Sequence, residues 1–266
     1  MKQMILDLCR DLDMPERIAN EAASADISPM QKYIDGLLSK ETGDETYKAL
    51  AESIGEDPRG IKMLALQLAA ALRSREMYAK RNFSDQIYID TMKCFPRFIQ
   101  ECEWRTGHPG FDTGWWSWRH LSLTLFRLGT LEFETNDVDG IKTLSVHIPS
   151  NAVMTRENLN ASYKWAAEFF TWYDYEYIYS DTWLLSPALK ELLPEGSRIL
   201  EFMSDYDIEK INPDGQSFME FLFKKKYPDI DSLPEDTSLR RAVKKHLKAG
   251  GKIGDAFGRY RKNEAY

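Results

Sequence analysis

The chain has 266 residues, of which 43% are hydrophobic and 29% charged, and its formal net charge is −7. This composition suits a globular protein of one large or two ordinary domains and excludes a mainly disordered chain. No apolar run approaches the roughly 18 residues that a membrane-spanning helix needs, and the first residues do not resemble a signal peptide. Three cysteines without a CxxC pair argue against a disulfide framework or a zinc ribbon. We therefore expect a cytoplasmic protein that does not enter a membrane.

The charge is unevenly distributed along the chain. Residues 224–262 carry a net charge of +7, whereas the rest of the chain carries −14. A basic segment on an acidic body can bind a phosphorylated small molecule or nucleic acid. The same run is also typical of an ordinary solvated helix face, and we favour that interpretation.

The first part of the chain is predicted to be helical. Ser28-Pro29 and Asp57-Pro58 are both typical of helix starts, because a serine or aspartate caps the free amides and proline suits the first turn. Apolar residues recur with helical spacing after each of these pairs. A third apolar stripe, over residues 87–102, contains Pro96, which should kink or divide its helix.

A loop at residues 107–114 is followed by a group of tryptophans and one more expected helix, through about Arg127. The apolar spacing then changes to the alternation of strands. Residues 128–135 and 143–148 alternate, and the turn residues at 136–140 predict a hairpin between them. A helix opened by Thr155 should pack one apolar face on the resulting sheet. That face consists of Leu159, Tyr163, Ala166 and Phe170.

The remaining elements are expected in a mixed order. These are a strand at 175–180, a short helix at 187–193, a strand at 198–203, and helices near 216–226 and 238–248. The sequence thus predicts an α+β protein, with a helical N-terminal domain over residues 1–115 and a mixed α/β domain over residues 116–266.

Common catalytic signatures are missing from the sequence. It has no HExxH, GxSxG or GxxxxGK[ST] motif, and its four histidines are far apart, so we expect no metal site. The glycine-rich segment 250–258 looks like a phosphate loop, but it follows a helix rather than preceding one. We therefore predict a helix end that leads into a terminal strand.

Residues 50–57 resemble the turn of a helix-turn-helix DNA-binding motif. A recognition helix needs polar and basic side chains for base edges and phosphates. The helix expected here offers mainly leucines and alanines, so core packing is the better interpretation and we expect no nucleic-acid partner.

Residues 147–155 form a predicted strand–loop–helix unit. The first amides of a helix lack partners and carry the positive end of its dipole, so they suit a pyrophosphate. An ordinary connection, with Thr155 as the cap and His147 as a hydrogen-bonded polar residue, explains the same residues.

Several ordered segments resemble a bacterial two-domain acyltransferase family, with a helical N-acyltransferase N-terminal domain and a GNAT-like C-terminal domain. The resemblance covers nearly the whole chain. It is carried by residues 91–98, 110–116, 127–134, 146–149 and 182–187.

This resemblance implies that acyl-CoA lies between two splayed strands. Residues 144–148 would be the splayed central strand, and residues 150–154 would be the pyrophosphate loop. The implied cofactor-binding residues are Ile148, Ser150, Asn151, Ala152, Val153 and Thr155. The chain departs from the usual GNAT pattern because residues 149–155 contain no glycine, so an atypical binding mode and an inactive scaffold both remain open.

The chemistry implied by the resemblance is transfer of an acyl group from acyl-CoA to an acceptor, expected to be an amine. A general base deprotonates the amine, and backbone amides polarise the thioester carbonyl. The candidate catalytic residues are Glu134, His147, Ser180 and Asp181. Ser180-Asp181 stands where the family often has a Cys-His pair. A non-catalytic GNAT-like scaffold and a DNA-binding regulator are the alternative functions.

Overall fold

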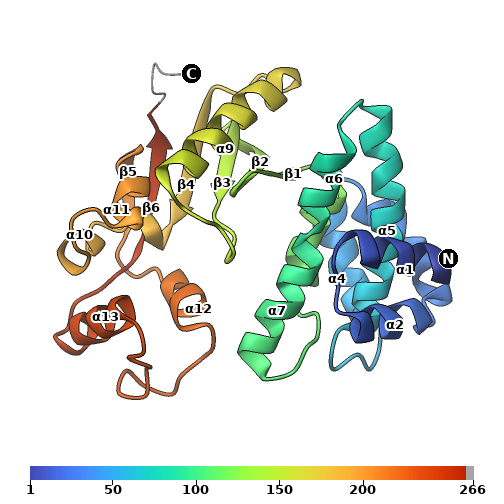
Figure 1. The fold of residues 1–266 in the computed structure, drawn as a ribbon, viewed down its shortest axis with the longest axis horizontal. Coiled ribbons are helices and arrows are strands. Elements are labelled where there is room, and N and C mark those ends of the chain that lie inside the picture. The colour runs from blue at the N-terminus through green and yellow to red at the C-terminus, as the bar shows by residue number, and fades with distance from the viewer. Residues whose placement is uncertain (262–266) are drawn as a thin grey trace. The chain divides into compact units, whose positions relative to one another are not determined.

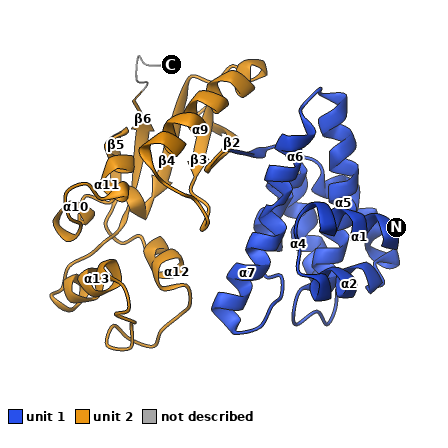
Figure 2. Ribbon diagram, viewed as in Figure 1, with its two compact units in different colours: residues 1–128 blue, residues 129–266 orange. Residues whose placement is uncertain are grey.

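The computed structural model describes residues 1–261, and the chain separates into two compact units, residues 1–128 and residues 129–266 (Figure 2). Unit 1 is helical except for one short strand, and unit 2 is built on a mixed sheet (Figure 1). The predicted α+β fold, with helices first and a mixed α/β region second, is confirmed. Within the described part of the chain, no helix has both the length and the apolar composition needed to cross a bilayer.

Unit 1 is organised around one long, buried helix, α5 (Ile61–Lys80). The helices that accompany it are α1 (Lys2–Asp11), α2 (Glu16–Ser24), α3 (Ile34–Leu37), α4 (Gly43–Ser53), α6 (Asp85–Met92), α7 (Cys94–Thr106) and α8 (Gly114–Leu121), with a 3₁₀ turn at Ser28–Tyr33. The Asp57 carboxylate accepts hydrogen bonds from the amides of Lys62 and Met63, at 3.2 and 3.0 Å. Asp57 therefore binds free amides of the first turn, but α5 begins at Ile61 with Gly60 at the N-cap position, three residues later than the predicted start at Pro58.

The burial of α5 shows which role this helix plays. Leu64, Ala65 and Leu66, which are successive residues about 100° apart around the helix, are all fully buried. The core-packing interpretation of this segment is therefore confirmed. A helix covered on so much of its circumference does not present a face to a DNA groove.

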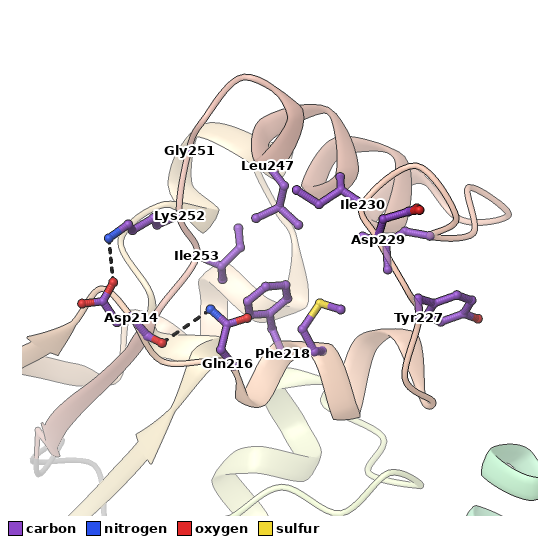
Figure 3. Close-up of a pocket in the computed structure, with 12 residues that line it drawn as sticks. Asp214, Gln216, Phe218, Tyr227, Asp229, Ile230, Leu247, Gly251, Lys252 and Ile253 are labelled. Atoms are coloured by element: carbon purple, nitrogen blue, oxygen red, sulfur yellow. Dashed lines mark hydrogen bonds and ion pairs between the residues drawn. The ribbon is translucent and has the colours of Figure 1, made fainter.

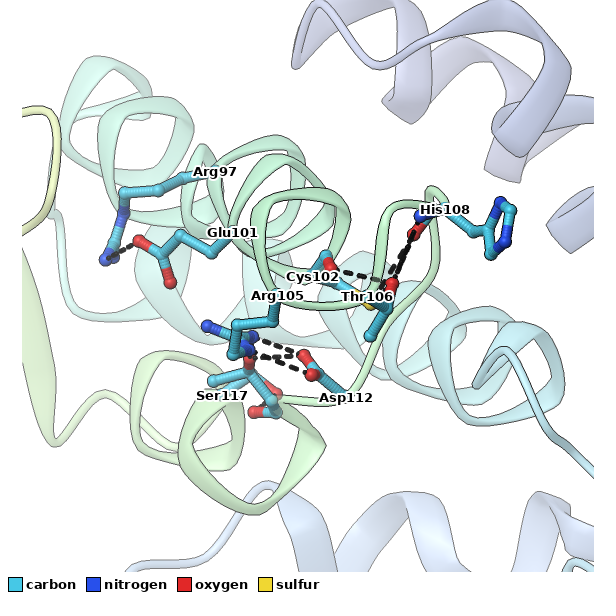
Figure 4. Close-up of polar contacts among 9 residues, drawn as sticks. Arg97, Glu101, Cys102, Arg105, Thr106, His108, Asp112 and Ser117 are labelled. Atoms are coloured by element: carbon cyan, nitrogen blue, oxygen red, sulfur yellow. Dashed lines mark hydrogen bonds and ion pairs between the residues drawn. The ribbon is translucent and has the colours of Figure 1, made fainter. Parts of the chain in front are cut away.

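Pro96 divides the third apolar stripe, as predicted. Helix α6 ends at Met92 and α7 begins at Cys94, so the proline occupies the first turn of α7, where no amide donor is needed. Farther along α7, the Arg105 Nε donates to Asp112 Oδ2 at 3.0 Å, and a second guanidinium nitrogen contacts the other carboxylate oxygen (Figure 4). This pairing fixes the glycine-rich loop after α7.

The expected helix through Arg127 is wrong, because α8 ends at Leu121 and a strand, β1 (Leu125–Leu128), follows. The helix is closed by a left-handed residue, Leu123 (φ 56°), and the Thr124 amide donates to the Arg119 carbonyl at 3.1 Å. This termination normally uses glycine. Leucine at that position gave no sequence signal for the helix end.

The sheet of unit 2 contains β2 (Leu131–Val138), β3 (Ile141–His147), β4 (Tyr177–Thr182), β5 (Tyr206–Asn212) and β6 (Asp255–Tyr260). Their spatial order is β2-β3-β4-β6-β5, and β3–β4 is the parallel pair among antiparallel neighbours. The predicted hairpin is β2–β3.

Helix α9 (Arg156–Phe169) lies on one face of this sheet (Figure 1). The predicted apolar face is confirmed, since Leu159, Tyr163, Ala166 and Phe170 are all buried. Tyr163 contacts Phe133 of β2 edge to face, with ring centroids 6.0 Å apart. Phe133 therefore points to the helix-covered face, and its strand neighbours Glu132 and Glu134 point to the other, as the sequence predicted.

The strand expected at residues 198–203 is wrong, because these residues form helix α11 (Arg198–Met203). A short apolar run does not distinguish a helix from a strand by its spacing. The strand follows the helix instead, as β5. An irregularity between Ile208 and Lys210 disturbs the alternation that would have revealed β5 in the sequence.

The end of the chain contains α10 (Leu189–Leu192), α12 (Ser217–Phe223), α13 (Ser238–Lys248) and then β6. The predicted short helix, the last two helices and the terminal strand after the glycines are confirmed. The basic side chains of α13 bind the loop between α12 and α13. Arg240, Lys244 and Lys248 pair with Asp236, Glu235 and Asp231, respectively.

Gly129 provides a test of how closely α9 packs. Its φ is +69°, and an added Cβ would lie 2.6 Å from Ser162 Oγ, which accepts a hydrogen bond from the Thr130 amide. We expect Gly129→Ala to lower the free energy of unfolding by about 2–3 kcal/mol, through backbone strain and overpacking.

Gly140→Ala is the matched control, because Gly140 also has positive φ (+82°) but no atom within 4 Å of an added Cβ. It should cost only the strain, about 1 kcal/mol. Urea unfolding of the two variants measures the difference, and equal losses would contradict the proposed contact.

Candidate active site

The face of the unit 2 sheet that points away from α9 carries a row of largely buried polar side chains, in which Glu132, Ser145 and Tyr179 are 3%, 6% and 7% exposed. The strand register places Glu134 of β2 opposite Ser145 of β3, which in turn lies opposite Tyr179 of β4. The next pair on the same face of the hairpin, two residues along, is Glu132 opposite His147. Directly opposite residues share a face, so this row lies on the side away from α9.

Two of the predicted catalytic residues are in contact on this face. His147 Nε2 lies 2.8 Å from Glu134 Oε2, across the diagonal of the β2–β3 hairpin. The Glu134 side chain is 14% exposed and that of His147 is 27% exposed. A carboxylate at this distance orients the imidazole ring.

The parallel strands β3 and β4 pair over only three residues. Their register runs from Thr143 opposite Tyr177 to Ser145 opposite Tyr179. Beyond this point the Val146 carbonyl accepts a hydrogen bond from the Ser180 hydroxyl, at 3.0 Å. A side chain thus occupies the position of a main-chain donor, and the two strands diverge toward their carboxyl ends.

The loop predicted to bind pyrophosphate connects this divergence to α9. The Ala152 amide donates to the Pro149 carbonyl, and the Val153 amide to Thr130 Oγ1, both at 2.8 Å. Ser150, Asn151 and Val153 are exposed, and Ile148 is half-buried.

Thr155 is the N-cap of α9, as predicted. Its hydroxyl accepts from the Asn158 amide at 3.3 Å. The following amides, of Arg156 and Glu157, have no acceptor within the helix, because they belong to its first turn. Arg156 itself is directed elsewhere, since its guanidinium contacts both carboxylate oxygens of Asp205, at 2.8 and 2.7 Å.

Asp181, the fourth predicted catalytic residue, is not part of the Glu134–His147 contact. It is exposed at the end of β4, opposite Phe257. Partial desolvation, together with the nearby Asp255 carboxylate, raises the pKa of Asp181 above its ordinary value.

Tyr179 is a site residue that the sequence reasoning missed. Its hydroxyl accepts a hydrogen bond from Asn136 Nδ2 at 2.7 Å, and its ring stacks on Phe257. Desolvation raises the pKa of Tyr179, so the phenol keeps its proton at neutral pH. The available signal was strand alternation, because Asn136 lies two residues after Glu134, and Tyr179 two residues before Asp181.

A cavity of about 310 Å³ lies elsewhere in unit 2, between α12, α13 and the segment before β6 (Figure 3). Phe218, Leu247 and Ile253 form its apolar walls, and the Lys252–Asp214 ion pair lies at one end. This cavity contains none of the predicted catalytic residues. Within residues 1–261, no cluster of His, Cys, Asp and Glu is arranged to hold a metal ion.

The sheet and the diverging parallel strands agree with comparisons to known families. A model of a GNAT-like C-terminal domain matches residues 125–260, and a model of an N-acyltransferase N-terminal domain matches residues 4–123. The chain belongs to the GNAT-like acyltransferase family. The resemblance noted in the sequence is therefore confirmed over nearly the whole chain.

Solved structures similar to this GNAT-like protein share its complete fold. An acyltransferase in complex with decanoyl-CoA and teicoplanin is 25% identical, with a TM-score of 0.79 over 96% of this chain and 87% of that one. An acyltransferase in complex with CoA and 10C-teicoplanin is 24% identical, with a TM-score of 0.80 over 97% and 87% of the two chains. The comparison with curated proteins found no match.

The raised pKa of Asp181 predicts a pH-dependent effect on stability. The folded protein binds this proton more tightly than the unfolded chain, so ionisation of Asp181 destabilises the fold as pH rises above the ordinary aspartate value of 3.8. Asp181→Asn should therefore raise the Tm at pH 7, and the gain should shrink toward pH 3. Thermal unfolding at both pH values checks this, and an equal gain at both would contradict it.

Proposed function

We propose that this GNAT-like protein transfers an acyl group from acyl-CoA to an amine, with its reaction centre on the polar face of the unit 2 sheet. The observation that carries the proposal is the short parallel pairing of β3 and β4, which ends beside the Glu134–His147 contact. The divergence offers a path for an extended chain between the strands. We propose that the Glu134–His147 pair supplies the base where that path ends.

The loop and the strands together support a position for the donor. We propose that its pyrophosphate binds near Ser150–Thr155, at the positive end of the α9 dipole. The Ala152 and Val153 amides have acceptors within the protein. The anion is therefore assigned to the first-turn amides of Arg156 and Glu157.

The pantetheine arm would run between β3 and β4 toward Ser145 and Tyr179. Alternate residues of a strand direct their main-chain groups to the same edge. The Val146 carbonyl faces β4 through its contact with Ser180, so we expect the Ile148 amide to face the same gap. We expect it to donate a hydrogen bond to an amide carbonyl of the pantetheine arm where the arm enters the gap.

The transfer requires one proton acceptor. The amine nitrogen attacks the thioester carbonyl carbon, the C–S bond breaks, and the amine proton passes to His147. The Glu134 carboxylate stabilises the resulting imidazolium across 2.8 Å. The products are an amide and CoA, and the proton that His147 took from the amine is released to the CoA thiolate.

We assign to Tyr179 a hydrogen bond to the departing sulfur. It lies on the last paired rung of β3 and β4, where the gap closes. The hydrogen bond that it accepts from Asn136 leaves its own O–H to donate. Its raised pKa favours a hydrogen-bond donor over full proton transfer, because the phenol holds its proton more tightly than usual.

The neighbouring structures support a long acyl donor. One similar acyltransferase is in complex with decanoyl-CoA and another, a mutant, with octanoyl-CoA. The first of these complexes also contains teicoplanin. We propose a small-molecule acceptor for this chain, and nothing in its own residues specifies which amine it is.

The proposed base predicts a loss of turnover without a loss of donor binding. His147→Gln and Glu134→Gln should each lower kcat by about 10²–10⁴-fold, while the Kd for decanoyl-CoA stays within about twofold. Steady-state release of CoA and calorimetry measure the two quantities. Unchanged turnover in His147→Gln would exclude the histidine as the base.

The proposed anion site predicts a charge-dependent loss of binding. Ala152→Glu should weaken decanoyl-CoA binding by about 100-fold or more, because a carboxylate would repel the pyrophosphate. Ala152→Gln is the matched control, with the same size and no charge, and it should bind at least about tenfold more tightly than the glutamate variant.

The wild-type titration also tests the function itself. If neither acetyl-CoA nor decanoyl-CoA bound the wild-type protein, the missing glycine loop would be decisive, and a non-catalytic scaffold would replace the enzyme. Equal losses in the glutamate and glutamine variants would instead move the pyrophosphate site away from this loop.

A further inference from the structure

We propose that Ser180 is a positioning residue whose hydroxyl keeps β3 and β4 apart and so holds open the path of the pantetheine arm. This inference rests on the proposed acyl-CoA function. It concerns the width of the gap between the strands, and Ser180 does not take part in the chemical step.

The contact itself distinguishes this role from proton donation. Ser180 is fully buried, and its Oγ donates to the Val146 carbonyl at 3.0 Å. The hydroxyl proton is therefore directed at the main chain of β3. Directly across β4, Ser180 pairs with Gly258 of β6, which fixes the strand on its other edge.

The register shows what the hydroxyl replaces. In a parallel ladder continued beyond Ser145 and Tyr179, the Val146 carbonyl would accept from the Asp181 amide. That arrangement would set the strands at the usual spacing of about 4.8 Å, which leaves no space for another chain between them. A donor carried on Cβ satisfies the carbonyl from farther away.

A variant without the Ser180 hydroxyl leaves the Val146 carbonyl without its donor. A buried carbonyl that loses its hydrogen-bond donor is destabilised, so it favours any other donor within reach. In Ser180→Ala the most accessible remaining donor is the Asp181 amide, so the ladder should extend by one rung. The gap would then close in the free protein, and the pantetheine arm would have to reopen it.

The chain offers a matched control for this buried hydrogen bond. Ser186 is also buried, and its hydroxyl also donates to a main-chain carbonyl, that of Ile253. It lies beyond β4, outside the diverging strands. Ser186→Ala thus removes the same kind of contact without affecting the gap.

The binding experiment compares three ligands by calorimetry: decanoyl-CoA, CoA, and adenosine 3′,5′-bisphosphate, which lacks the pantetheine arm. Ser180→Ala should weaken decanoyl-CoA and CoA by about tenfold and leave the bisphosphate unchanged. Ser186→Ala should leave all three unchanged. The inference is overturned if Ser180→Ala binds decanoyl-CoA like the wild type, or if it loses the bisphosphate to the same extent.

A measurement on the ligand-free protein separates this inference from the proposed function. Amide hydrogen exchange at Asp181 should be at least about tenfold slower in Ser180→Ala than in the wild type, because the amide gains a carbonyl partner. Unchanged exchange would refute the proposal that the Ser180 hydroxyl keeps β3 and β4 apart, whether or not the protein binds CoA. Failure of the wild type to bind decanoyl-CoA, with slower exchange in the variant, would instead remove the acyltransferase proposal and keep the structural role.

Discussion

Three residues of β3 pair with β4, and beyond them a serine hydroxyl takes the place of the next main-chain donor. Parallel strands gain most of their stability from a continuous ladder, so an interrupted pair needs support from both sides. Here β2 supports β3 over seven paired positions, and β6 supports β4 over four. The helix-covered face adds Phe133 and Tyr163 beneath the same strands. The pairing of β3 with β4 can stop early because each of these strands is held on its other edge by β2 or β6.

The two faces of the sheet carry different kinds of side chain. On the α9 side, aromatic and aliphatic side chains are buried against one helix. On the other side, Glu134, His147 and Tyr179 form a compact polar group around the last paired rung. Strand alternation alone separates these sets, which is why a chain with no catalytic signature motif can still bring polar side chains together on one face of a sheet.

Much of this arrangement could be predicted from the sequence, because it depends on local patterns. The hairpin turn, the Thr155 cap and the apolar stripe of α9 each have a short-range signal, and all three are present in the structure. The end of α8 was missed because leucine occupies the left-handed position normally taken by glycine. Strand β5 was missed because an irregularity at Ile208–Lys210 disrupts its alternation. The partnership of Asn136 with Tyr179 joins residues 43 positions apart, so no local pattern could predict it.

The ion pairs of the C-terminal segment change what its number of basic residues means for an approaching molecule. Arg240, Lys244, Lys248 and Lys252 each lie within 3 Å of a carboxylate oxygen. At distances beyond a Debye length, which is about 8 Å at physiological ionic strength, each ion pair acts as a dipole. The field of a dipole decays with distance much faster than the field of a single charge. An anionic ligand diffusing toward the protein would therefore be attracted far less than the count of basic residues suggests.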